Sequence, residues 1–194
     1  MYIWLFLIVL VFIVLWGISL YNFFISSKAK IKAAVQEIGN QLKRQADLIP
    51  NLESSVKGYL KHESGIFEKL TQARKAVAGA IKSGNVGEMA KAGSMLSEVL
   101  PRIQVAVEDN PELKASDVVG KLMDELRDTA DKIMYARRLV IDLTVDYNVR
   151  RVSFPSSVMA NLFKFEELPG LITAQEGEHL KVSESEMKSP KVKL

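Results

Sequence analysis

The chain contains no cysteine among its 194 residues. This absence excludes disulfide bonds, thiolate metal sites and cysteine nucleophiles, and it is compatible with a reducing compartment. Histidine is also scarce, because only His62 and His179 occur. The pair His62-Glu63 is followed one turn later by Ile66 and Phe67, so the two-histidine pattern of the helical metalloproteases is missing.

The sequence patterns of other common catalytic sites are missing as well. No glycine-rich phosphate loop ends in Lys-Ser or Lys-Thr, and no serine combines with a histidine and an acid on a strand–turn–helix frame. We therefore predict no catalytic residue, no metal ligand and no cofactor, and we expect the protein not to be an enzyme. The net charge is only +3, and acidic residues alternate with basic ones along the chain, so we expect no nucleic-acid partner.

The first 25 residues contain no charged side chain. As a helix, about 24 residues reach about 36 Å, which is enough to cross a hydrocarbon core of about 30 Å. A cleaved secretory signal would have a basic start, a shorter apolar core and small residues at its end, and this stretch has none of these. We predict a permanent transmembrane anchor over residues 1–25.

The flanks of this anchor predict its orientation. Lys28, Lys30 and Lys32 follow it directly, and no lysine or arginine precedes it. The positive-inside rule then places the N-terminus outside and the rest of the chain in the cytoplasm, in the cell (inner) membrane. We expect Tyr21 and the three lysines to lie at the membrane interface, where the lysines meet anionic lipid headgroups.

The rest of the chain has helical periodicity, with no hairpin signal and no sustained alternation of period two. We predict an all-α protein in which the anchor precedes an elongated up-and-down antiparallel bundle of about four long helices. The expected domains are the anchor, the bundle over residues 26–169 and a disordered tail over residues 170–194. The expected helices cover residues 26–46, 50–82, 86–107 and 117–151, followed by a short amphipathic segment over residues 156–165.

Local signals set the expected helix ends. The first body helix continues the anchor and stops near Asp47 and Pro50, with Asp47 capping the next helix. Ser83-Gly84-Asn85 ends that helix, and Ser116 caps the last long one. We expect Pro101 to kink the third helix. Inside the second, Gly58 and Gly65 indicate close packing.

These boundaries coincide with motifs of one family. The motifs are Asp47-Leu-Ile-Pro-Asn-Leu52, Val56-Lys-Gly-Tyr59 with His62-Glu63, Asn110-Pro-Glu-Leu-Lys-Ala115, Ala136-Arg137, Tyr147-Asn148 and Ser153-Phe-Pro155 with Ala160. With them the chain resembles the LemA family over residues 21–165. The resemblance implies a bacterial single-pass membrane protein with a short outer segment and a helical-bundle body. It implies no biochemical activity, because the family as a whole has none established.

The chain departs from the family pattern at three places. Val35 stands where the family usually has an aromatic residue, and Val140-Ile141 replaces a Tyr-Asn pair. Asn110 replaces the aromatic residue that usually precedes the Pro-Glu-Leu-Lys-Ala run. Either part of a functional surface is lost here, or the replaced residues were core filling. We favour core filling, because valine and isoleucine restore apolar volume.

Three polar residues are the candidates for a structural or docking role. Asn51 would satisfy backbone groups at a helix start, and Tyr147 and Asn148 would hydrogen-bond to a neighbouring element. We favour a structural role, in which these side chains fix helix register, over a docking site for a partner.

Two functions fit these observations. The first is a membrane-anchored interaction or scaffold protein, whose partners are the lipid bilayer and unidentified proteins, with self-association left open. The second is an accessory subunit or adaptor of a membrane-embedded enzyme such as a protease. The anchor lacks a Gly-xxx-Gly pattern, which favours the first.

Overall fold

The protein is an elongated assembly of helices in a computed structural model that describes residues 2–59 and 64–170. No strand occurs in these two ranges, so the all-α prediction is confirmed. The helices are α1 (Tyr2–Val56), α2 (Ser64–Ser83), α3 (Val86–Glu108), α4 (Pro111–Lys114), α5 (Asp117–Val152) and α6 (Ser156–Leu162). The predicted disordered tail lies outside the described residues, except for Gly170, and so do His62, Glu63 and His179.

Helix α1 is continuous over 55 residues, or about 82 Å. The predicted break near Asp47 is wrong, because the helix passes through Pro50 and ends at Val56. Proline removes one backbone hydrogen bond, but Ile49 and Leu52 on either side are fully buried. Tertiary packing therefore holds the helix together across the proline, and exposed Asp47 caps nothing.

The real break lies between α1 and α2. Residues 57–59 form a turn, and α2 begins at Ser64 rather than at Pro50 as predicted. The predicted close packing at Gly58 and Gly65 is also wrong, because a Cβ atom at either position would meet nothing within 4 Å.

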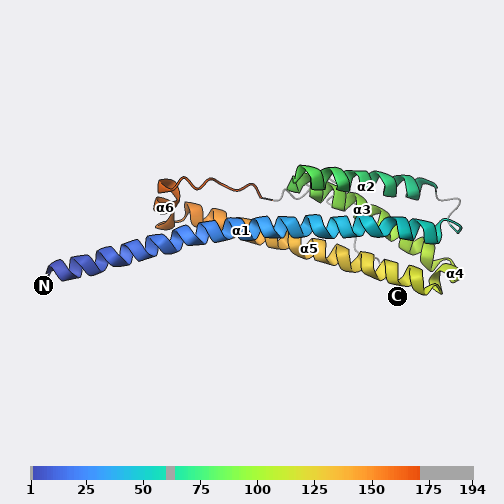
Figure 1. The fold of residues 1–194 in the computed structure, drawn as a ribbon, viewed down its shortest axis with the longest axis horizontal. Coiled ribbons are helices and arrows are strands. Elements are labelled where there is room, and N and C mark those ends of the chain that lie inside the picture. The colour runs from blue at the N-terminus through green and yellow to red at the C-terminus, as the bar shows by residue number, and fades with distance from the viewer. Residues whose placement is uncertain (1, 60–63, 171–194) are drawn as a thin grey trace, which may run out of the picture.

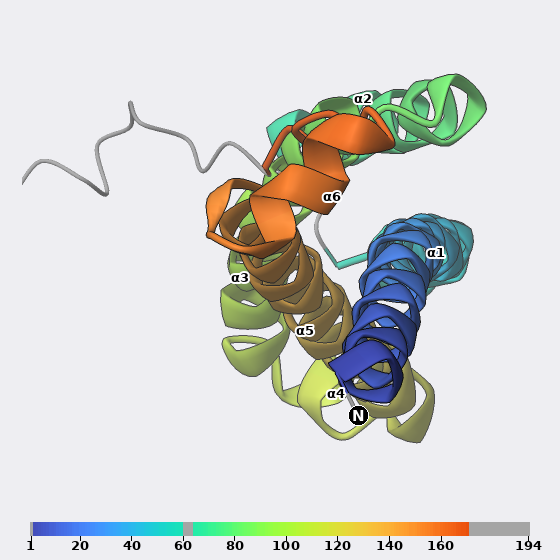
Figure 2. The ribbon, with the colours of Figure 1, turned by 90° about the vertical axis from the view of Figure 1, so that its left-hand side faces the viewer.

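The four long helices run alternately up and down a rod (Figure 1). Helices α1 and α5 pack against each other along most of the rod. Helices α2 and α3 form a hairpin that covers the distal half of the rod, the half farther from the N-terminus. Viewed from the end, the long helices surround a common centre, with α6 over the end of α5 (Figure 2). The predicted antiparallel bundle is therefore confirmed.

The main core is aliphatic and draws on all four long helices. Leu42 of α1, Leu96 of α3 and Leu126 of α5 are each at most 1% exposed. Leu42 comes so close to Gly93 of α3 that a Cβ atom there would lie 3.4 Å from its Cδ2. The only buried amide side chain among the described residues, Gln45, donates to the carbonyl of Leu126 at 3.3 Å.

The predicted turns after α2 and before α5 are confirmed. Gly84 has φ of +67°, which glycine adopts without steric cost, and the side chain of Asn85 caps α3. The hydroxyl of Ser116 accepts a hydrogen bond from the backbone N–H of Val119 and caps α5. Pro101 lies inside α3.

The three departures from the family pattern have structural roles. Val140 is buried in the main core, and Val35 packs against it half-buried. The side chain of Asn110 caps α4 by accepting from the backbone N–H groups of Glu112 and Leu113 at 3.1 and 3.3 Å. The valines agree with core filling, whereas Ile141 is exposed and does not, and Asn110 has a local capping role.

Candidate functional site

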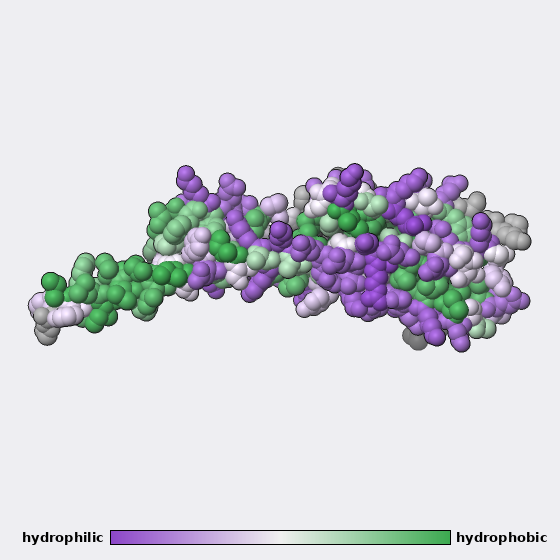
Figure 3. All heavy atoms as spheres, in the orientation of Figure 1, coloured by the Kyte–Doolittle hydropathy of each residue, from purple (hydrophilic) through white to green (hydrophobic). Residues whose placement is uncertain are grey.

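The first part of α1 extends beyond the helical body. All side chains from Tyr2 to Leu15 are exposed, and almost all of them are large and apolar. In the space-filling view they form a green projection at the left end of the molecule (Figure 3). Within residues 2–59 and 64–170, α1 is the one helix long and apolar enough to cross a membrane. We call residues 2–25 the apolar segment.

An aromatic cluster lies where the apolar segment meets the body. Phe24 of α1 is fully buried and stacks on Phe165, with ring centroids 4.7 Å apart. It also meets Tyr147 of α5 edge-on at 5.4 Å, and Ala160 of α6 completes the cluster. We call these four residues the junction cluster; it is separate from the main core and joins three segments distant in sequence.

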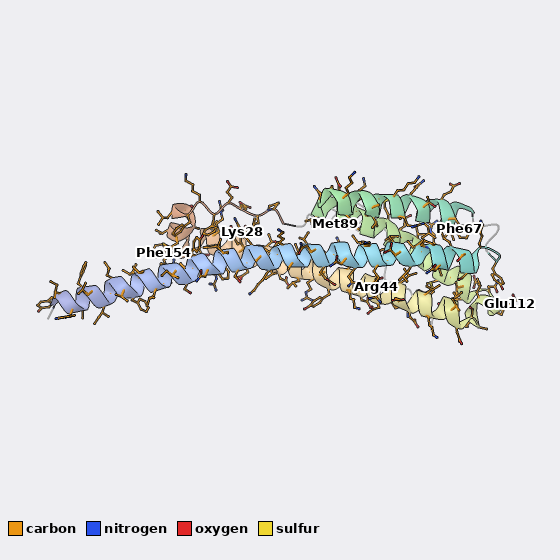
Figure 4. All side chains as sticks on the ribbon, viewed as in Figure 1. Lys28, Arg44, Phe67, Met89, Glu112 and Phe154 are labelled. Atoms are coloured by element: carbon orange, nitrogen blue, oxygen red, sulfur yellow. The ribbon has the colours of Figure 1, made fainter. Side chains whose placement is uncertain are left out.

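Cations surround the aromatic rings of this region. The Lys28 Nζ atom lies 5.4 Å from the ring centroid of Phe165 and 5.9 Å from that of Tyr147. The Arg150 guanidinium lies 4.1 Å from the ring centroid of Phe23. Such contacts stabilise a charge at the edge of apolar surface. Figure 4 shows Lys28 and Phe154 at the same end of the body, and Glu112 at the opposite end.

Hydrogen bonds from α5 hold the chain that follows α6. The amide nitrogen of Asn148 donates to the carbonyl of Leu168 at 2.8 Å, and its oxygen accepts from the Leu168 N–H at 3.0 Å. The Tyr147 hydroxyl donates to the carbonyl of Glu166 at 3.0 Å. Arg151 Nε donates to the carbonyl of Phe165 at 3.0 Å. Residues 165–168 are therefore bound to α5 through their backbone.

The Tyr147 phenol is the titratable group most affected by this environment. Burial raises its pKa above the ordinary value of 10.0. Nearby Arg151 lowers the pKa and the Glu166 carboxylate raises it, each with a smaller effect than burial. Burial therefore favours the neutral phenol, which is the form that donates to the Glu166 carbonyl.

Four of the predicted site residues meet at this junction. Tyr21 contacts Phe165 with ring centroids 5.8 Å apart, Lys28 lies over Tyr147, and Asn148 follows Tyr147 on α5. The geometry agrees with a structural role for Tyr147 and Asn148, because their side chains hydrogen-bond to the backbone of residues 166 and 168.

The other predicted site residues lie elsewhere. Lys30 and Lys32 are exposed on α1 just beyond the junction. Asn51 lies 27 residues beyond Phe24 in the same helix, which corresponds to about 40 Å. It is exposed, and its own carbonyl accepts hydrogen bonds from the hydroxyls of Ser54 and Ser55. The predicted role of Asn51 at a helix start is wrong, because no helix starts there.

Sequence reasoning missed Phe24, Phe165 and the contact between Gly17 and Met159. A Cβ atom at Gly17 would lie only 2.9 Å from the Met159 Cε atom, so the Met159 side chain packs directly against the backbone of α1 at this glycine. A lone glycine in an apolar helix carries no signal that distinguishes such a contact.

No metal site is evident in the part of the chain that the structure describes. No group of three or more His, Asp or Glu side chains comes together there in a way that could hold a metal ion. Two of the charged pairs join helices: Arg44 of α1 pairs with Glu125 of α5, and Lys69 of α2 pairs with Glu98 of α3 at 3.0 Å. Glu125 raises the pKa of Arg44, and Lys69 lowers the pKa of Glu98, through hydrogen bonding and charge.

Comparison with known proteins assigns the family. No curated protein matches the chain significantly. A model of the LemA family matches residues 34–193, which include α2 to α6 and the Tyr147-Asn148 pair. The apolar segment lies before the matched region. The match covers most of the chain, and the protein therefore belongs to the LemA family.

Proposed function

We propose that this protein is a membrane-anchored scaffold without catalytic activity of its own, which holds a helical rod at a fixed position relative to the bilayer. The observation that carries the proposal is the continuity of α1. The same helix begins with exposed apolar side chains from Tyr2 to Leu15 and continues, without a linker, as one of the long helices of the body.

The continuity of α1 gives the proposal a geometry. Beyond Ile25, α1 continues for 31 residues to Val56, or about 46 Å. Its buried residues pack against α5 and the α2–α3 hairpin, so the body moves with the anchor as one unit. A body that hangs from a flexible linker samples many distances from the bilayer, whereas this one is restricted to the positions that the tilt of α1 allows.

The cations beyond the anchor support an orientation. Lys30 and Lys32 are exposed, and Lys28 lies at the junction cluster, so all three reach the headgroup level together. The positive-inside rule then favours a cytoplasmic body and an outer N-terminus in the cell membrane. A Tyr135→Cys variant tests this, because Tyr135 is 71% exposed and the natural chain has no cysteine. We expect no labelling by an impermeant thiol reagent on intact cells; labelling there would reverse the orientation.

The distance between the rod and the bilayer tests the scaffold directly. In proteoliposomes, a donor fluorophore at Asn51→Cys is read against acceptor lipids, with Lys30→Cys as the matched control on the same helix. We expect the Asn51 probe to lie about 30 Å farther from the lipid acceptors than the Lys30 probe, from 21 residues of helix. Equal energy transfer at both positions would mean that the rod lies flat, and would refute the proposal.

The second candidate function is an accessory subunit of a membrane-embedded enzyme such as a protease. The exposed side chains from Tyr2 to Leu15 favour it, because they leave one part of α1 free to pack against other transmembrane helices. Replacing residues 2–15 by an unrelated apolar helix separates the two functions. Crosslinks to partners that survive the replacement support the scaffold, and crosslinks that disappear support the accessory subunit.

A further inference from the structure

Helix α6 and the residue before it expose an apolar face. Phe154, Val158 and Leu162 follow one another at four-residue steps, so they share one side, and they are 84%, 58% and 68% exposed. The opposite side of α6 carries Ser156 and Ala160, which are both buried. A helix on a body surrounded by water normally has its polar residues outside and its apolar residues inside. This one instead exposes its large apolar side chains.

The apolar face of α6 continues that of the apolar segment. Phe163, just after α6, packs edge-on against Tyr21 with ring centroids 5.0 Å apart. Between the two helices lies an open groove of about 460 Å³, lined by Ile13, Val14 and Ile18 of α1 and by Met159. In Figure 3 the green surface over α6 lies next to the green N-terminal projection. One apolar surface therefore extends from the anchor onto the body.

The depth of α6 relative to the anchor is set by its contacts. Gly17, beside Met159, precedes Tyr21 by four residues, which is about 6 Å along the helix. Lys28, the first cation, lies seven residues beyond Tyr21, about 10 Å farther from the bilayer centre. Interfacial amphipathic helices bury their apolar face about 5–10 Å into the boundary between headgroups and acyl chains. The contacts of Phe163 and Met159 with α1 therefore lie about 10 Å and 16 Å below the level of Lys28, beneath the headgroups and among the outer parts of the acyl chains.

The charges near α6 fit a phospholipid surface. Lys164 is exposed directly after the apolar residues, and Arg150 lies over the Phe23 ring at the end of α5. Together with Lys28 they form a basic layer just beyond the apolar one. Two carboxylates, those of Glu166 and Glu167, follow in sequence, and Glu167 lies 3.9 Å from Arg151. A basic layer over an apolar one matches the order of phosphates over acyl chains.

We propose that α6 and Phe154 form a second membrane-binding element, which inserts into the interface of the leaflet that α1 leaves. Its ligand is the phospholipid surface itself: acyl chains contact Phe154, Val158 and Leu162 and enter the groove beside α1. The continuity with the apolar segment, the depth and the basic layer together favour lipid over a second protein as the occupant. The inference rests on the proposed membrane anchorage and adds a second point of attachment, at the end of α5.

The test measures the depth of single probes in the full-length protein. An environment-sensitive fluorophore is placed at Val158→Cys or Leu162→Cys, in vesicles of phosphatidylcholine and phosphatidylglycerol that carry quenchers near the headgroup or near the chain end. Met134→Cys is the matched control, because Met134 is 65% exposed on α5, far along the body. Leu10→Cys in the apolar segment tests the anchorage independently.

We expect the Val158 and Leu162 probes to be quenched most by the shallow quencher, at a depth of about 5–10 Å, and the Met134 probe by aqueous iodide alone. A Leu10 probe quenched by the deep lipid, with Val158 and Leu162 probes quenched by iodide like Met134, would overturn the inference and leave the anchorage intact. A Leu10 probe without lipid quenching would overturn both. Probes at α6 shielded from lipid and iodide alike, with Leu162→Cys forming disulfide-linked dimers, would show that a second copy covers the face.

A second measurement, made without the fluorophore, controls for loosening of α6 by the attached label. The unlabelled Leu162→Cys variant is treated with an impermeant maleimide in vesicles and again after transfer to detergent. We expect slow reaction in vesicles and faster reaction in detergent, because only the bilayer shields this side chain. Equal rates in the two media contradict the inference.

Discussion

Replacing Asn148 by alanine tests whether α5 holds the chain that follows α6. The side chain makes two hydrogen bonds to one residue: it donates to the Leu168 carbonyl at 2.8 Å and accepts from the Leu168 N–H at 3.0 Å. Each such bond contributes about 0.5–1.5 kcal/mol net, so the two together stabilise the closed segment by about 1–3 kcal/mol. The Asn148→Ala variant should lose that amount locally while the distant main core stays intact.

Amide hydrogen exchange measures this loss directly. An opening free energy lower by about 1–3 kcal/mol makes exchange of the Leu168 N–H about 5–150 times faster, since about 1.4 kcal/mol corresponds to a factor of ten. Core amides such as that of Leu96, which is fully buried, should keep their exchange rates. Asn161→Ala is the control, because Asn161 is an exposed asparagine in α6.

One further variant helps to decide whether Asn148 holds the chain that follows α6 or docks a partner. Asn148→Asp retains an acceptor for the Leu168 N–H, but it places a carboxylate oxygen against the Leu168 carbonyl, so it should speed exchange at least as much as alanine does. Unchanged exchange of Leu168 in both variants would refute the reasoning. A variant that keeps its exchange rates but loses a crosslinked partner would instead make Asn148 a docking residue.

Three other predictions concern the junction, the core and a cap. Tyr147→Phe removes the hydrogen bond to the Glu166 carbonyl, 3.0 Å long, and should destabilise the junction by about 0.5–1.5 kcal/mol, read as faster exchange at residues 165–168. Because burial raises the Tyr147 pKa, its contribution to stability is complete below about pH 10 and is lost as the pH rises through the folded-state value; a denaturation series in which Tyr147→Phe and the natural protein lose stability equally above pH 10 would contradict this. Leu42→Ala should cost about 2–5 kcal/mol in chemical denaturation, because Leu42 is fully buried, whereas Val105→Ala at a 56% exposed position should cost far less; similar costs would rule out the described core. Asn110→Phe, which restores the aromatic residue typical of the family, should lower stability by about 1 kcal/mol through loss of the α4 cap, and a rise in stability would show that a packing gain outweighs the cap.

The sequence predicted helix ends well where a capping side chain or a glycine turn marks them. Ser116 and Asn85 cap α5 and α3 through their own oxygen atoms, and Gly84 provides a positive φ, so each position carries a local signal. Pro50 carries an equally strong local signal, yet it misled, because burial of Ile49 and Leu52 in the core outweighs one lost backbone bond. A local sequence pattern does not contain the free energy of packing against distant helices, so it does not predict this outcome.

The junction shows a second limit of sequence reasoning. Tyr147 and Asn148 were identified as polar residues that hydrogen-bond to a neighbour, but their partners are the backbone carbonyls of Glu166 and Leu168. Backbone groups occur at every residue and have no pattern. The stacking of Phe24 on Phe165 joins positions 141 residues apart, so only the fold reveals it.

The sequence also does not show which side of α6 faces the body. Phe154, Val158 and Leu162 have the spacing of a helix face that packs inward, and the sequence alone reads them as part of a short amphipathic segment. In the structure the buried positions are Ser156 and Ala160 instead. Periodicity identifies a face but does not say whether protein or another medium covers it.

The unbroken course of α1 has a mechanical consequence. A helix that leaves the bilayer without a hinge acts as a lever, so any change in its angle is enlarged at the far end. Transmembrane helices tilt by about 20° on average, and that angle moves a point about 46 Å outside the membrane sideways by about 16 Å. A change in bilayer thickness that alters the tilt of residues 2–25 would therefore swing the distal turn after Val56 over the membrane surface. Figure 1 shows that α4 and the start of α5 lie at this same distal end.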